Sequence, residues 1–275
     1  VVGLQDYNHF VDLLYLPDID VLDVSSGLGF VNIKNDSDGK LRRLPIVGEL
    51  DGKLVPHFCL KLISEHLKYD LNNVELVNRY KLLMHNFPIL NETKTVEVPL
   101  DGKGNILINY LGFEKIEKQI ESQNFFYQSA WPLINSQKSH NYQDKIVIFG
   151  DHSLSARDYS STPIDGKIHN PLIFSMIISN ILNNDFIKPV SGFIHFFQVA
   201  FILAILIFCS IRFKVLEFIL TFIIIILLYI ALNFTLFINS SIQINVLLAL
   251  IPSLISGIYL IIYNVYDSQL TMGVL

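Results

Sequence analysis

The chain has 275 residues, a formal net charge of −5 at pH 7, and 51% hydrophobic residues against only 16% charged ones. This balance, with no run of basic residues, leaves no electrostatic footprint for nucleic-acid binding. The composition also changes near Pro189. The first part is mixed and long enough for one globular domain. Residues 193–266 are almost entirely apolar and contain only Arg212, Lys214 and Glu217 as charged groups, so a wholly water-soluble protein is excluded.

The N-terminal part starts with two runs that are typical of strands. Residues 27–33 (GLGFVNI) predict the first strand and residues 40–50 (KLRRLPIVGEL) the second, with a turn signal at Asp51-Gly52. Residues 55–69 (VPHFCLKLISEHLKY) then predict a helix, because apolar residues recur there at helical spacing.

Further strands and a second helix are predicted along the same domain. Residues 95–112 predict a hairpin, because apolar residues alternate on both sides of the turn signal DGKGN. Residues 144–150 (DKIVIFG) hold a short, continuous apolar run, which is typical of a strand buried on both faces. Residues 170–184 predict a helix. These patterns predict an α/β domain over residues 1–188.

The segment NDSDGK, between the first two predicted strands, has some features of a calcium loop. With Gly39 at position six of an EF-hand, Asp38 and Asp36 occupy ligand positions. Lys34 and Pro45, however, fall where the first acid and the final glutamate are required, so an EF-hand is rejected. We expect a tight turn instead, in which Gly39 supplies a positive φ.

Arg42 and Arg43 follow this turn and raise the alternative of an anion site. Side chains alternate along a strand, so we expect the two arginines to point to opposite faces and at most one of them to join a given site. A structural turn with surface salt bridges is favoured over anion binding, with Arg42 or Arg43 as a possible ligand contact.

A second polar stretch follows the predicted strand at residues 144–150. A loop after the carboxyl end of a buried strand is where α/β folds usually bind ligands. Four interpretations stay open, namely a structured connector, which is favoured, a ligand-contacting loop, a metal site and a Ser-His-Asp hydrolase. No G-x-S-x-G elbow and no H-E-x-x-H spacing supports catalysis or metal binding. The candidate residues are Asp151, His152, Ser153, Ser155, Arg157, Asp158, Thr162 and His169.

The C-terminal part predicts an all-α bundle of three transmembrane helices, at about residues 193–211, 215–237 and 244–265. Residues 189–266 therefore form the membrane part, and residues 267–275 the start of a tail. Basic residues lie in the first loop between spans and none lies in the second. The positive-inside rule then places the N-terminal domain outside and the C-terminus in the cytoplasm.

The order of these motifs resembles the type-two CHASE domain, a sensory extracellular domain associated with cyclases and histidine kinases. The resemblance rests on GFVNIKNDSDGKLRRLP, VPLDGKGNILINYLG, DKIVIFGDHSLSARDYSSTP, and FIKP leading into three spans. The matching motif positions are Gly29, Val31, Asn32, Asp36, Asp38, Gly39, Arg42, Arg43, Pro45, Gly150, Asp158, Thr162 and Pro163. The family pattern also includes an earlier span and an earlier α/β half, so we expect this chain to hold only the second part of the sensor.

The resemblance implies an extracytoplasmic sensor domain on three transmembrane helices, in a receptor of the bacterial inner membrane. The output module, a cyclase or a kinase, would lie outside this chain, which is itself expected not to be an enzyme and to need no cofactor or metal. The expected partners are the membrane, an unknown small-molecule or protein ligand, a cytoplasmic signalling module in cis or in trans, and a second copy of the chain. Two other functions stay open: a membrane-anchored structural or partner-binding subunit, and a membrane-tethered hydrolase.

Overall fold

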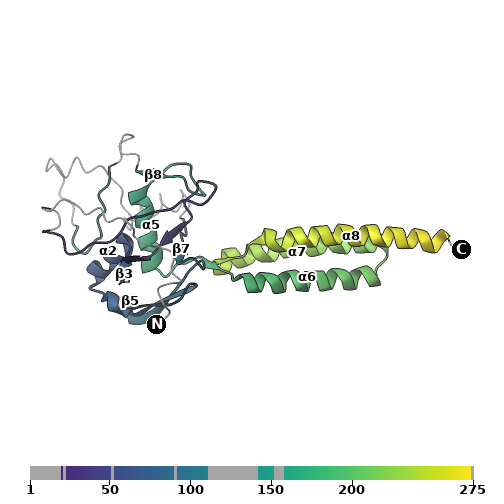
Figure 1. Cartoon of the computed structure of the whole chain (residues 1–275), viewed down its shortest axis with the longest axis horizontal. Helices are drawn as coiled ribbons and strands as arrows, with labels where there is room; N and C mark the ends of the chain where they lie inside the picture. The colour runs from purple at the N-terminus through teal and green to yellow at the C-terminus, as the bar shows by residue number, and fades with distance from the viewer. Residues whose placement is uncertain are drawn as a thin grey trace. The chain divides into compact units, whose positions relative to one another are not determined.

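The computed structural model describes residues 20, 23–50, 53–89, 92–110, 142–151 and 158–273. The chain forms two compact units, Val1–Ile187 and Lys188–Leu275. The described part of the first unit mixes short strands with helices, and the second consists mainly of three long helices (Figure 1). The predicted fold class, a mixed strand and helix domain followed by three apolar helices, is therefore confirmed.

The largest sheet in the described residues is a three-stranded antiparallel meander. It contains β4 (Val74–Asn78), β5 (Lys81–Ile89) and β6 (Glu92–Pro99), in that order. Buried residues alternate along β5 and β6, as expected when one face of a sheet packs on the core. β6 pairs with β5 and not with the strand that follows it, so the predicted hairpin at residues 95–112 is wrong.

The two strands of that expected hairpin lie in different sheets. β7 (Asn105–Leu107) pairs antiparallel with β1 (Arg43–Pro45). β2 (Val47–Leu50) pairs antiparallel with β3 (Lys53–Pro56). The single strand predicted at residues 40–50 is therefore two strands with different partners. They separate at Ile46, whose carbonyl accepts a hydrogen bond from His57 N. Pro45 just before it has no N–H to extend the ladder.

Both helices predicted in the first unit are present, as α2 (Phe58–Leu67) and α5 (Asn170–Leu182). α2 ends at Lys68, which adopts a left-handed conformation (φ 52°). α5 has Pro171 in its first turn, where the missing N–H has no helical partner to lose. Apolar periodicity is a local signal, and here it located both helices, although the first two residues of the helix predicted at 55–69 belong to β3.

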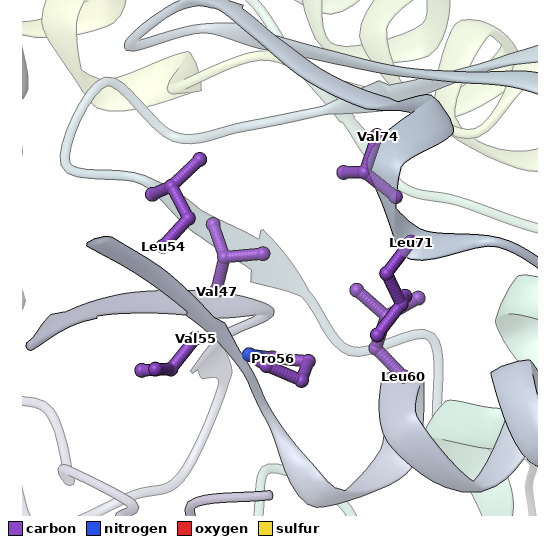
Figure 2. Close-up of a pocket in the computed structure, with 7 residues that line it drawn as sticks. All are labelled: Val47, Leu54, Val55, Pro56, Leu60, Leu71 and Val74. Atoms are coloured by element: carbon purple, nitrogen blue, oxygen red, sulfur yellow. The ribbon is translucent and has the colours of Figure 1, made fainter.

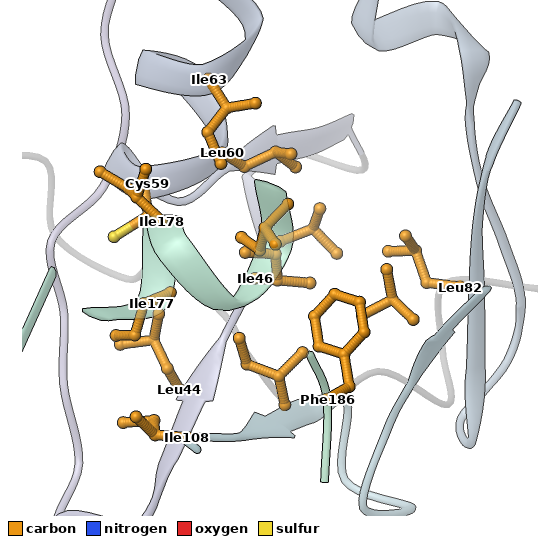
Figure 3. Packing of buried hydrophobic residues seen from close by; sticks show 14 of the residues in the cluster. Leu44, Ile46, Cys59, Leu60, Ile63, Leu82, Ile108, Ile177, Ile178 and Phe186 are labelled. Carbon is orange, nitrogen blue, oxygen red and sulfur yellow. The ribbon is translucent and has the colours of Figure 1, made fainter. Parts of the chain in front are cut away.

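The core of the first unit lies where α2, α5 and the first strands meet (Figure 3). Side chains of both helices converge there on strand residues and on Phe186, and almost all are fully buried. Burying such side chains is the main driving force for folding. The residues labelled in Figure 3 are Leu44, Ile46, Cys59, Leu60, Ile63, Leu82, Ile108, Ile177, Ile178 and Phe186.

Two predicted strands are wrong. Residues 27–33 form only an isolated bridge, in which Phe30 pairs with His57. Residues 144–150 form no strand. Ile146 and Ile148 pack against the core, whereas Val147 is 41% and Phe149 73% exposed. The apolar run is therefore buried on one side only, and the argument for a ligand loop after a doubly buried strand loses its basis.

The second unit contains α6 (Gly192–Arg212), α7 (Val215–Ser240) and α8 (Val246–Gly273), which lie side by side (Figure 1). All three are long and apolar enough to cross a membrane. The prediction of three long apolar helices is confirmed, and α8 continues eight residues beyond the expected end at 265.

Side chains connect the three helices. Gly257 of α8 faces the ring of Phe222 on α7, with no room for a larger residue. Asn264 of α8 donates from Nδ2 to Ser210 Oγ on α6 at 3.0 Å. A small residue at a helix contact and a polar pair between helices are both typical of membrane bundles.

Candidate functional site

The segment NDSDGK forms a tight turn. Gly39 has φ +77° and its N–H donates to Asp36 O at 2.9 Å, while Asp36 N donates to Lys40 O at the same distance. Asp38 Oδ1 accepts from Lys40 N at 3.2 Å. Asp38 therefore acts in part as a turn former, as acidic residues often do beside glycine.

Five charged residues around this turn form a connected group, which we name the arginine–aspartate cluster: Asp36, Asp38, Arg42, Arg43 and Asp101. Arg42 holds Asp38 through two bonds of 2.8 Å and reaches Asp36 Oδ2 at 3.1 Å. Arg43 donates from one terminal nitrogen to Asp36 Oδ1 at 2.5 Å, and its Nε lies 3.2 Å from Asp101 Oδ2.

The expectation that at most one of the two arginines joins a given site is wrong, because Asp36 binds both. Alternation fixes the direction of Cβ within a strand. Arg42 precedes β1, which begins at Arg43, so strand alternation does not apply across this pair. Both side chains are also long enough to turn back towards the same carboxylate.

The cluster is electrostatically almost balanced, with three carboxylates and two guanidinium groups. The Arg42 guanidinium, through its hydrogen bonds, lowers the pKa of Asp38 to about 2. Asp38 and then Asp36 raise the pKa of Arg42 in return. An anionic ligand would have to displace these carboxylates from the arginines. The arrangement therefore supports a structural role for Asp36, Asp38, Arg42 and Arg43 over an anion site.

Asp101 belongs to a second turn, DGKGN, with Gly102 at φ +84° and Gly104 at φ +87°. Its Oδ1 accepts from Lys103 N at 2.8 Å and from Asn105 N at 3.1 Å. Arg43 therefore joins two turns that are far apart in the sequence, beside the β1–β7 pair. Asp101 was not among the site residues predicted from the sequence. The turn that contains it has the same Asp-Gly-Lys run as the turn at Asp38.

Asp158 and Thr162 hold a small hairpin at the start of α5. β8 (Tyr159–Ser160) pairs antiparallel with β9 (Ile168–His169). Thr162 is fully buried and exchanges hydrogen bonds with the Asp165 backbone, 2.9 Å to its carbonyl and 3.0 Å from its N–H. Asp158 Oδ1 accepts from Asn170 Nδ2 at 2.8 Å.

The structure tests the hydrolase arrangement only in part. His152, Ser153, Ser155 and Arg157 lie outside the described residues, and Asp151 is exposed. The Asp158 carboxylate is engaged with Asn170 at the beginning of α5. Within the described ranges, no group of three or more His, Cys, Asp or Glu is arranged to hold a metal ion.

A buried histidine, His57, is a further polar site that the sequence patterns did not single out. It caps α2, with Nδ1 accepting from Cys59 N at 3.2 Å, and it is fully buried. Its ring lies edge-on to Phe30 and Phe174, with centroids 5.0 and 5.6 Å away. Nε2 has no hydrogen-bond partner among the described residues.

Burial lowers the pKa of His57 to about 3 and raises the pKa of the neighbouring Cys59 thiol. His57 is therefore neutral, with its proton on Nε2 because Nδ1 accepts. The helix predicted at residues 55–69 includes His57, whereas α2 begins only at Phe58, so no local pattern marked this histidine as the cap.

The described residues also form a shallow apolar hollow of about 60 Å³ (Figure 2). It lies between the β2–β3 hairpin and the region of α2, the short 3₁₀ helix η2 (Leu71–Asn73) and β4. Small-molecule sites are usually about 300–1,000 Å³, so this hollow alone does not enclose a ligand. Its lining is Val47, Leu54, Val55, Pro56, Leu60, Leu71 and Val74.

Comparison with known proteins gives one family. The model of the CHASE2 domain matches residues 4–212, which includes all but the first three residues of the first unit and all of α6. No curated protein and no solved structure matches the chain. The match covers well over half of the sequence and contains both turns of the arginine–aspartate cluster. The chain therefore belongs to the CHASE2 domain family.

Proposed function

We propose that this chain is the extracytoplasmic sensor and membrane anchor of a bacterial transmembrane signalling receptor. It passes a ligand or partner signal to a cytoplasmic cyclase or kinase module outside the chain. The observation that carries the proposal is the CHASE2 match over residues 4–212, followed by two further membrane helices. CHASE2 is a sensory domain and not a catalytic one, which favours a receptor over a tethered hydrolase.

The mechanism that fits this architecture is a shift between two arrangements of the sensor. A ligand changes such an equilibrium only by as much as its affinities for the two states differ. Typical coupling free energies are about 1–3 kcal/mol. No residue of the arginine–aspartate cluster needs to react chemically for this function, because the cluster only has to hold the sensor in one arrangement.

The apolar hollow is too small to support an enclosed small-molecule ligand. Leu54, on its rim, is 39% exposed, and every residue around the hollow is apolar. Single exposed apolar residues are normal on protein surfaces, so the hollow does not by itself favour a protein partner.

The distribution of basic residues supports one orientation in the membrane. Arg212 and Lys214 flank the short connection between α6 and α7, whereas the connection between α7 and α8 has no basic residue. We infer that the first unit is extracytoplasmic and that the chain ends in the cytoplasm of an inner-membrane protein.

The proposal is tested with reporters attached after Leu275. Green fluorescent protein there should fluoresce, and alkaline phosphatase there should be inactive, whereas both results should be reversed at Ser241. Active phosphatase after Leu275 would refute the orientation.

Signal transfer is tested by joining the full chain to a cyclase domain after Leu275 and measuring cyclic nucleotide in cells. Arg43→Gln, which breaks the arginine–aspartate cluster, should change output at least threefold, and Arg79→Gln on the exposed β4–β5 turn should not. Equal output from both variants, with the chains folded and inserted, favours the partner-binding subunit.

A further inference from the structure

The segment that leaves the first unit makes an unusual pairing in the second. β10 (Lys188–Pro189) pairs with β11 (Ile242–Gln243), and the pairing is parallel. Lys188 N donates to Ser241 O at 2.8 Å, and Val190 N donates to Gln243 O at 3.1 Å. The connection between these strands consists of α6 and α7, so two residues just before the first span bind the loop between the second and third.

Local conformations on both strands favour this pairing. Pro189 lies between the two donors, Lys188 and Val190, at a position that donates no hydrogen bond to β11. Its ring fixes φ near −65°. Ser241 ends α7 in a left-handed conformation (φ 52°), which turns the chain out of the helix, and its carbonyl accepts from Lys188. The α7–α8 loop, residues 241–245, is therefore attached to the segment before α6.

The same segment is held in the first unit by the residues just before it. Phe186 is buried in the core of the first unit, and Ile187 forms an antiparallel bridge with Leu107 of β7. Leu107 is also the partner of Arg43 in β1. Ile187 and Lys188 are adjacent in the chain, so one peptide bond connects the β1–β7 ladder, which carries the arginine–aspartate cluster, to the ladder of the α7–α8 loop. We name residues 186–190, of which Lys188–Pro189 form β10, the exit strand.

We propose that the exit strand transmits movement of the sensor to the α7–α8 loop as well as to α6, so that all three membrane helices respond. The proposal rests on the proposed function and adds its route. Ser191, directly after the exit strand, is the N-cap of α6. The exit strand is therefore connected both to the start of α6 and to the α7–α8 loop. Hydrogen bonds of 2.8 and 3.1 Å weaken steeply when their geometry changes, so the loop either follows the strand or is released from it.

The pairing is measured by disulfide formation in the full chain in membranes. Lys188→Cys with Ile242→Cys replaces directly paired residues. Copper phenanthroline is the oxidant, and linked peptides are quantified by mass spectrometry. The mismatched pair, Lys188→Cys with Ile238→Cys on α7, is the control and should link at least tenfold more slowly. Equal rates for the two pairs would overturn the proposal.

Coupling is measured by adding Arg43→Gln to the matched pair. The rate should fall at least threefold, with a smaller fall for Arg43→Lys and none for Arg79→Gln, which changes an exposed arginine of the same unit. An unchanged rate with Arg43→Gln refutes the route. If the cyclase fusion still responds to Arg43→Gln in that case, the receptor function stands and only the exit strand is excluded. If the rate falls but the fusion does not respond, the route stands and the proposed output is wrong.

Discussion

At the scale of single residues, burial strongly changes the ionisation of His57. Burial lowers its pKa from 6.5 to about 3. At a pH between these two values, His57 is protonated in the unfolded chain and neutral in the folded chain. His57 therefore contributes stability that is fully present above pH 6.5 and is lost as the pH falls towards 3. The loss should be about 1.4 kcal/mol per pH unit, or about 2 kcal/mol at pH 5.

This pH dependence is checked by urea unfolding of the full chain at pH 7.5 and pH 5. His57→Asn keeps an acceptor for Cys59 N but removes the titrating group, so the difference in unfolding free energy between the two pH values should shrink by about 2 kcal/mol. His66→Asn, at an exposed position of the same helix, is the control. An identical pH difference in the native chain and His57→Asn would contradict the prediction.

The two arginines of the arginine–aspartate cluster should differ in their effect on stability. Arg43 faces Asp101, whose side chain is only 9% exposed, whereas Arg42 faces Asp38, which is 53% exposed. We expect Arg43→Gln to reduce the free energy of unfolding by about 1–2 kcal/mol and Arg42→Gln by less than about 1 kcal/mol. Urea unfolding at low salt measures both. The reverse order would show that Arg43 does not hold the two turns together.

At this scale, the residues that form the turn could be predicted from the sequence, but the side chains that they contact could not. Asp38 and Gly39 form a turn through interactions with residues close in the sequence, so a short motif is enough to predict it. The contact of Arg43 with Asp101 depends on the pairing of β1 with β7, and no local pattern records that pairing. His152 lies outside the described residues, so its place in a ligand-contacting loop stays a prediction.

At the scale of elements, Asn180 attaches α5 to the segment after β7. Its Oδ1 accepts from Asn109 N at 3.0 Å and its Nδ2 donates to Asn109 O at 3.1 Å, and the side chain is almost fully buried. Asn180→Ala leaves two backbone groups without these partners, so we expect a loss of about 2–4 kcal/mol in unfolding free energy. Asn183→Ala, on the exposed end of the helix, should change it by less than about 0.5 kcal/mol. Thermal unfolding of both variants decides this, and similar melting temperatures would rule the attachment out.

Helices could be predicted from this sequence much better than strands. Helix periodicity is local, and α2 and α5 lie within the residues where it indicates helices. Strand pairing depends on partners that are distant in the chain. The run at residues 95–112 alternates correctly, with Val96 and Val98 buried, but its two halves pair with β5 and β1.

At the scale of the whole molecule, composition alone separated the membrane part from the rest, because hydrocarbon requires about 20 consecutive apolar residues. Helix contacts inside the bundle were less predictable. Ser253 and Gly257 are small residues four positions apart on α8, a spacing typical of close helix contacts, and Gly257 lies against Phe222. The partner helix, α7, could not be chosen from spacing.

This contact predicts a compensating pair. Gly257→Leu should destabilise the bundle by about 1–3 kcal/mol, because the new side chain overlaps the Phe222 ring. Phe222→Ala in the same chain should recover part of that loss, giving a coupling of about 0.5–3 kcal/mol. Unfolding by denaturing detergent in lipid nanodiscs measures all three variants. Costs that simply add would place the two residues out of contact.

Gly29 has a consequence for how sequences of this family can diverge. A Cβ at this position would lie 2.7 Å from Phe58 Cα and 2.8 Å from Phe58 N, both backbone atoms that cannot rotate away. Phe30, the next residue, accepts a hydrogen bond from Phe58 N and covers the His57 ring. Exposed neighbours such as Leu28 and Val31 have no such restriction. Mutational drift should therefore be free at Leu28 and Val31 and stop at Gly29, where a single added methyl group would lift the chain away from the buried histidine and admit water to it.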